Sequence, residues 1–175
     1  MRKLNFLVGV LIFSVALPTT NSYCSVQSAE IDSLTQLIDL SPSPADKATH
    51  NFALAELLEL EDSVRLSYYN AAFVEAKKTQ TDSLVVAVLL GKYHFFYDKG
   101  EYIDCFKIAE QLQPFLAKNI HYSQEIEIHR SLAMPLHHFG DYEESQSHYF
   151  KGIELAKANG DWNQKYSLYT GLGRL

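Results

Sequence analysis

A spacing of 40 residues constrains the fold of this chain more than any single residue does. The same turn-like punctuation recurs three times, at Leu60-Glu61-Asp62, Gly100-Glu101-Tyr102 and Gly140-Asp141-Tyr142. A fixed period in this range is typical of arrays of small helical units. One unit cannot bury its own apolar face, so neighbouring units must stack to form a continuous core. The period therefore predicts stacked helical hairpins.

Composition supports a folded domain of ordinary size. The chain has 175 residues, of which 47% are hydrophobic and 21% are charged, so a sizeable core is expected and disorder is not. Its formal net charge is −6, and no Lys/Arg cluster follows the N-terminus. This charge pattern argues against a nucleic-acid partner.

The N-terminus has the order of a secretory signal peptide. Arg2 and Lys3 precede an apolar stretch over residues 4–17, which is too short for a membrane-spanning helix. Small residues allow cleavage after Ser22 or after Ser28. We expect residues 1–22 to be removed and the protein to be exported, to a periplasmic or extracellular location.

The two cysteines leave two alternatives. Cys105 falls in the apolar phase of an expected helix, where a free cysteine behaves as a small hydrophobic residue. A Cys24–Cys105 disulfide is the other alternative in an oxidising compartment, although no spacing pattern supports it.

Helical periodicity runs through the rest of the chain, and no segment alternates as a strand would. A short helix and a Pro-rich break occupy residues 30–44, and units follow at about 45–81, 82–121 and 122–161, with a partial unit at 162–175. Within them we expect helices at about 45–60, 62–79, 82–98, 102–112, 123–139, 142–158 and from 162 onward. The expected inward side chains include Val64, Tyr68, Ala72, Ala76, Val88, Leu89, Tyr93, Cys105, Ala109, Leu112, Ile126, Leu132, Ala133, Tyr142, Tyr149, Ile153 and Ala156.

Turn and cap residues punctuate these helices. Gly100 and Gly140 are expected to end their helices in the left-handed conformation. Asp141 with Glu144, and Asp161 with Gln164, have the spacing of capping boxes.

Apolar positions also recur in register. Gly91 and Gly171 lie two periods apart, and two triplets coincide at 40-residue spacing: Tyr69, Ala109 and Tyr149, and Ala76, Leu116 and Ala156.

The joins between helices resemble those of a known family. The segment from Tyr93 to Tyr102 and the segment from Leu132 to Tyr142 are similar to the helix–turn–helix join of a tetratricopeptide repeat. Gly160-Asp161 followed by residues 169–173 is similar to the start of a further unit. The family's small residue after each turn is matched by Cys105 and Ser145 but not by Arg65. The resemblance, to long-helix variants, implies an all-α fold: a right-handed superhelical stack of antiparallel helix hairpins, a TPR-like α-solenoid.

The resemblance also implies a concave binding groove lined by the first helix of each pair. Carried onto this sequence, the groove residues are Leu90, His94, Tyr97, Asp98, Glu127, Arg130, Met134, His137, His138, Ser167, Thr170 and Arg174. Spacings of three, four and seven place them on one stripe of each helix. A plain solvated helix face is the alternative interpretation.

Chemistry-bearing motifs are weak. His94 could meet His137 or His138 with Asp98 as a third metal ligand, but no zinc-enzyme spacing appears. There is no nucleophile elbow and no Gly-rich phosphate loop. We therefore expect no enzyme activity, catalytic residue, metal or cofactor.

The expected function is a non-catalytic scaffold that binds a protein or peptide. The alternative is the extracytoplasmic sensor portion of a bacterial signalling protein of the histidine kinase or diguanylate cyclase type, tethered to a membrane through a longer parent chain. The last unit has a first helix but no second, which leaves Tyr166, Tyr169 and Leu172 without a stacking partner. This uncapped edge would favour self-association.

Overall fold

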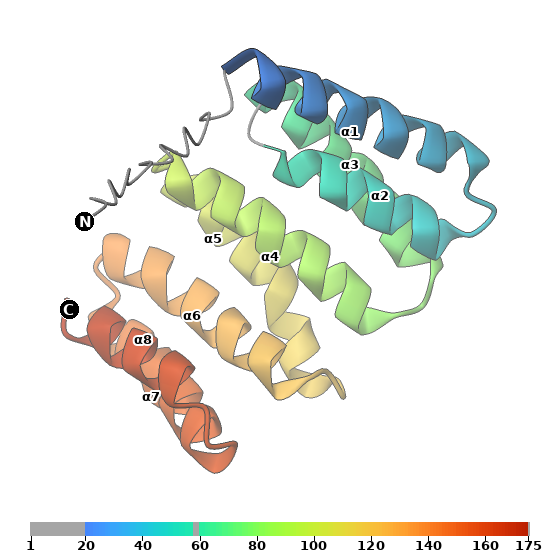
Figure 1. Ribbon diagram of the computed structural model, residues 1–175. Coiled ribbons are helices and arrows are strands. Elements are labelled where there is room, and N and C mark those ends of the chain that lie inside the picture. The colour runs from blue at the N-terminus through green and yellow to red at the C-terminus, as the bar shows by residue number, and fades with distance from the viewer. Residues whose placement is uncertain (1–19, 58–59, 175) are drawn as a thin grey trace, which may run out of the picture.

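The structure is a computed structural model and describes residues 20–57 and 60–174. Within those ranges the chain is all-helical, with no strand (Figure 1). The helices are α1 (Thr20–Leu40), α2 (Pro44–Glu56), α3 (Asp62–Lys78), α4 (Asp82–Asp98), α5 (Tyr102–Leu112), a 3₁₀ helix η1 (Gln113–Ala117), α6 (Tyr122–His138), α7 (Tyr142–Ala158) and α8 (Trp162–Leu172). The prediction of an all-α fold is confirmed.

Successive helices pack as pairs. α2 packs on α3, α4 on α5 and α6 on α7, while α8 packs on α7. Contacts also link α2 to α4, α4 to α6 and α6 to α8, so these four helices lie side by side with α3, α5 and α7 behind them (Figure 1). The first helices of successive pairs therefore share one face of the molecule.

Glycine ends the helices where the period places it. Gly100 and Gly140 have φ of +72° and +88°, a conformation that costs glycine little and other residues more. The amide of Gly100 donates to the Tyr97 carbonyl and the amide of Glu101 donates to Phe96, at 2.9 and 3.0 Å. This pair of bonds is the Schellman pattern, which satisfies carbonyls left open at a helix end.

Only one of the two expected capping boxes forms, and only in part. The Asp161 carboxylate accepts from the backbone amide of Gln164 at 3.1 Å, as expected. The prediction for Asp141 was wrong, because its side chain makes no capping bond at the start of α7. Neither box is reciprocal, since the Gln164 side chain turns to Glu127 on α6.

The core follows the 40-residue register. Tyr69, Ala109 and Tyr149 are all nearly inaccessible to solvent, at 1%, 0% and 3% exposed. One buried cluster runs from α2 to α6, and a second joins α6, α7 and α8. The buried clusters therefore link each helix pair to the next.

Three predictions of inward side chains were wrong. Tyr142 and Val64 are exposed, and Tyr68 is only half-buried while its neighbour Tyr69 occupies the core. Adjacent residues point about 100° apart on a helix, so Tyr68 is turned partly toward solvent while Tyr69 faces the core. In the last helix Tyr166 and Tyr169 are exposed, whereas Leu168 is completely buried.

The N-terminal helix is longer than expected. It begins at Thr20 rather than near residue 30 and continues unbroken past Ser22 and Ser28, the two predicted cleavage positions. Residues 1–19, which include the apolar stretch, lie outside the described residues. α1 ends at Leu40, before the Pro-rich segment, and Ser43 caps α2 by accepting from the backbone amide of Asp46 at 3.1 Å.

Candidate ligand-binding site

A cavity of about 360 Å³ opens between α4, α6 and α8, the helices that share one face. Most of the predicted groove residues line it: His94, Tyr97, Asp98, Arg130, Met134, Ser167, Thr170 and Arg174. These residues come from α4, α6 and α8, so the packing of these three helices brings them together.

The other predicted groove residues lie elsewhere. Leu90 is buried in the core, where it is 9% exposed. His138 stacks on Tyr102 of α5, with ring centroids 3.9 Å apart, and His137 lies against Tyr142 of α7. Both histidines lie at the C-terminal end of α6 and contact α5 and α7, so neither lines this cavity.

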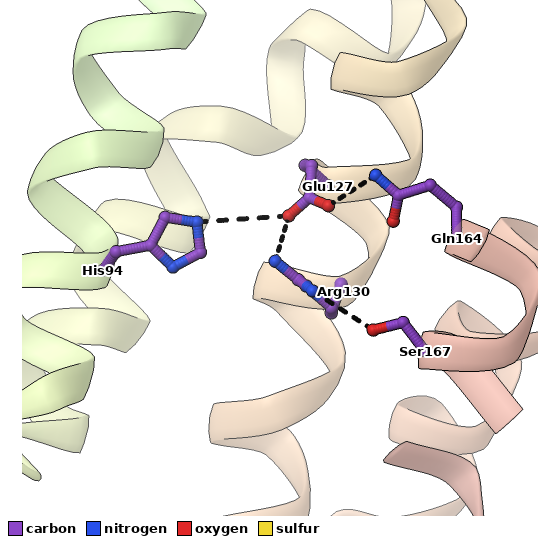
Figure 2. Close-up of polar contacts among 5 residues, drawn as sticks. All are labelled: His94, Glu127, Arg130, Gln164 and Ser167. Carbon is purple, nitrogen blue, oxygen red and sulfur yellow. Dashed lines mark hydrogen bonds and ion pairs between the residues drawn. The ribbon is translucent and has the colours of Figure 1, made fainter. Parts of the chain in front are cut away.

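Glu127 is not among the residues that line the cavity, but it bonds to Arg130, which does line it. Its carboxylate accepts from Arg130 and, at 3.0 Å, from the Gln164 amide group of α8 (Figure 2). Arg130 also donates to Ser167 at 3.4 Å. The network joins α6 to α8. The two Glu127 bonds are partly buried and the Arg130–Ser167 bond is exposed. Hydrogen bonds to a charged group are stronger than neutral ones.

On the α4 side, His94 points toward the same carboxylate. Its Nε2 lies 4.0 Å from Glu127 Oε2 (Figure 2). Burial lowers the pKa of His94 below 6.5, and the charge of Arg130 lowers it further, against the opposing effects of Glu127 and Asp98. The imidazole is therefore neutral at pH 7, so it can both donate and accept a hydrogen bond.

Aromatic rings form the apolar part of the wall. Tyr93 and Tyr97 stack one turn apart, with centroids separated by 6.1 Å and planes inclined by 11°. Tyr149 of α7 reaches the cavity beside Gly171 of α8. A Cβ at Gly171 would lie 2.5 Å from the Tyr149 ring, so only glycine lets α8 approach this closely.

The Tyr93 hydroxyl is a buried polar group with no hydrogen-bond partner. Its side chain is 1% exposed, and burial raises its pKa, with Tyr97 and Tyr149 among the groups that act on it. Unpartnered buried hydroxyls are rare in folded proteins because leaving them unpaired costs about 1–3 kcal/mol.

Sequence reasoning assigned Tyr93 and Tyr149 to the core and did not assign Gly171 to the site. The two tyrosines are buried, but each also reaches the cavity. The signal for Gly171 was its register with Gly91, which allows an equally close approach: a Cβ there would lie 2.4 Å from Phe52.

A second polar cluster lies between α6 and α7, away from this cavity. His129 and His148 are buried and their Nδ1 atoms are 2.9 Å apart. One imidazole must donate and the other accept, so the pair requires at least one neutral ring. Burial, with the added effects of His148 and Lys151, lowers the pKa of His129 to about 4.

Cys105 is a free, completely buried thiol. Its sulfur lies 3.8 Å from the Tyr93 carbonyl, and burial raises its pKa to about 11. The prediction of an inert core cysteine agrees with this environment, because the thiolate is the reactive form. The side chain of Cys24 lies outside the described side chains.

In the part of the chain that the structure describes, no three His, Cys, Asp or Glu side chains group as metal ligands would. Over the same residues, none of the helices has both the length and the apolar character needed to span a bilayer. No protein-family model, curated protein or solved structure matches the chain.

Proposed function

We propose that this chain is a TPR-like helical repeat that binds a protein or peptide segment on the face shared by α4, α6 and α8. One observation carries the proposal. Residues predicted for a groove from three separate units, among them Tyr97, Arg130 and Thr170, line a single cavity. A plain solvated face would give no reason for that convergence.

The repeat architecture in this proposal is a right-handed superhelical stack. Three features support it: helices packed in successive pairs, left-handed glycines 40 residues apart at Gly100 and Gly140, and 17-residue helices that suit a long unit. In such a stack the first helices line the inner face and present side chains to an extended ligand.

The role assigned to the face is binding without catalysis. The lining combines aromatic rings, which give large contact area, with charged groups that fix orientation. Arg130 is already held by Glu127 and Ser167, so a partner meets it in a fixed position. Preorganisation of this kind reduces the entropy lost on binding.

The proposed setting is outside the cytoplasm, because residues 1–22 have the composition of a signal peptide. The second candidate function is a sensor portion of a larger signalling protein. A cavity of about 360 Å³ favours it, since that volume is in the range of small-molecule sites. A downstream reading frame that encodes an apolar stretch of about 20 residues would support the sensor.

Site-specific photo-crosslinking tests the binding face. A benzophenone side chain at Thr170, which is exposed at the cavity, should crosslink a partner in cells. The matched control is Val74, which is 55% exposed on α3 in the opposite layer. Arg130→Ala should reduce the Thr170 crosslink. Crosslinking through Val74 alone, or a Thr170 product unaffected by Arg130→Ala, would contradict the assignment.

A further inference from the structure

The last helix, α8, exposes three aromatic side chains on one side. Trp162, Tyr166 and Tyr169 are 71%, 78% and 44% exposed. Spacings of four and three residues make them neighbours along one stripe of the helix. α8 lies at one end of the row of helices, where it packs on α7 and α6 (Figure 1). Large rings gathered on one exposed stripe are typical of an interaction surface.

The 40-residue register shows what covers the matching positions in the earlier units. Tyr166 is in register with Ile126 of α6 and Val86 of α4, which are both inaccessible to solvent. The second helix of each pair packs there: α7 shares a buried cluster with Ile126, and α5 shares one with Val86. The two positions in register with Tyr169 are also buried, namely His129 and Leu89. The exposed stripe of α8 therefore matches the surface that a second helix covers in the units before it.

A contact between the two helices of a pair repeats in the same register. The sulfur of Cys105 on α5 lies 3.8 Å from the Tyr93 carbonyl of α4. Forty residues later, the Ser145 hydroxyl of α7 donates to the Ala133 carbonyl of α6 at 2.8 Å. The next carbonyl in this series belongs to Gly173, which is exposed just after α8. A helix packed on α8 in the same way would present a small donor side chain, such as serine, to that carbonyl.

Lys165 sets the charge that suits such a helix. Its Nζ lies 4.5 Å from the centre of the Trp162 ring, so a positive charge lies within the aromatic stripe. The matching position in α6 is Glu125, which lines the same groove as Lys151 of α7. Because the sign on α8 is reversed, an acidic residue in place of Lys151 would be complementary. Residues 162–174 contain no Asp or Glu, so α8 of a second copy would not supply this charge.

We propose that the stripe of Trp162, Tyr166 and Tyr169, here called the α8 face, binds an amphipathic helix of a partner protein in the position that α7 takes on α6. The partner helix carries an acidic residue opposite Lys165. Its inward positions correspond to the buried residues of α7, which are Ser145, His148, Tyr149, Gly152, Ile153 and Ala156. Thr170 lies on the stripe that lines the α4–α6–α8 cavity, so the α8 face is a separate surface and does not depend on the function proposed for that cavity.

Trp162 reports on the α8 face directly, because it is the single tryptophan of the chain. The probe is a peptide with the sequence of residues 141–159 and a Lys151→Glu substitution, which is a helix of the proposed kind. Titrated into the purified chain, it should shift Trp162 emission to shorter wavelength and saturate below about 1 mM, since the ring leaves water. Joined after residue 175 through a flexible Gly/Ser linker, the same helix should shift the emission without added peptide, because the linker raises its effective concentration to the millimolar range.

Substitutions separate the α8 face from the fold. Tyr166→Ser should weaken the peptide about tenfold, whereas Tyr142→Ser, which removes an exposed tyrosine from α7, should not. In Lys165→Glu the charge preference should reverse, so that the peptide with the natural Lys151 binds about threefold more tightly than the substituted one.

Unchanged emission in both the titration and the fusion overturns the proposal. Undiminished binding by Tyr166→Ser does so too, as does a charge preference that Lys165→Glu leaves unaltered. Self-association of the chain that Tyr166→Ser abolishes would assign the α8 face to a second copy and would also overturn the proposal. Crosslinking through Thr170 does not enter these measurements.

Discussion

Acidification should loosen the packing of α6 against α7 through the His129–His148 pair. The two imidazoles share a hydrogen bond between Nδ1 atoms 2.9 Å apart, and both side chains are buried. If both rings were protonated, neither nitrogen could accept and two positive charges would face each other. Lys151 adds to this repulsion, and Glu144 opposes it. The folded state therefore resists protonation more than the unfolded chain does.

The size of the effect follows from the pKa of His129. Folding lowers it from 6.5 to about 4, and the complete difference corresponds to about 3 kcal/mol. The unfolded state binds more protons than the folded state in this window, so the free energy of unfolding falls as pH falls from about 6.5 toward 4. At pH 4.5 the loss due to His129 alone should be roughly 2 kcal/mol.

Urea denaturation at pH 7.5, 5.5 and 4.5 measures this loss in the free energy of unfolding. The wild-type free energy of unfolding should fall with pH more steeply than that of His129→Gln, by roughly 2 kcal/mol between the extremes. His138→Gln is the matched control because His138 is exposed. Parallel pH profiles for wild type and His129→Gln would refute this reasoning.

Three tests, two of them with a matched control substitution, address the packing and the caps. Gly171→Ala should destabilise the protein by about 1–3 kcal/mol, because its Cβ would lie 2.5 Å from a tyrosine ring; an unchanged melting temperature would count against the close approach. Ile153→Ala should cost about 2–5 kcal/mol by urea denaturation, whereas exposed Ile103→Ala should cost less than about 0.5 kcal/mol, and similar losses would contradict the assigned core. Asp161→Ala should cost about 1 kcal/mol and Asp141→Ala clearly less, since only Asp161 caps its helix; the reverse order would rule out the observed caps.

Sequence reasoning located the helices well because turn chemistry is local. Gly100, Gly140 and the Pro-rich break after Leu40 act on the backbone within a few residues, so their effects can be predicted without tertiary structure. The 40-residue register was also a better guide to the core than helical spacing alone. It selected Tyr69, which is buried, where spacing had favoured Tyr68.

The site could be predicted only for residues that share one stripe of a helix. His94, Arg130 and Thr170 lie on three such stripes, and the packing of α4, α6 and α8 brings the stripes together. The hydrogen bonds between helices could not be predicted in this way. That Gln164 would bond Glu127 rather than return to its own helix start depends on the distance between α6 and α8, which no local pattern contains.

The buried histidine pair was missed for a related reason. His129 and His148 belong to different helices and are 19 residues apart. This separation matches neither the spacing of one helix face nor the 40-residue spacing. His137 and His138 drew attention because they are adjacent, yet both turn away from the cavity. Proximity along the chain was the weaker guide in this case.

The bond between Glu127 and Gln164 gives the most direct test that α6 and α8 meet at one site. A double-mutant cycle of Glu127→Ala and Gln164→Ala, measured by urea denaturation, isolates this contact from the other bonds of each residue. We expect a coupling free energy of at least about 0.5 kcal/mol, because the two side chains are in contact at 3.0 Å and partly buried. Strict additivity of the two substitutions would contradict the assembly of the cavity from successive helical pairs.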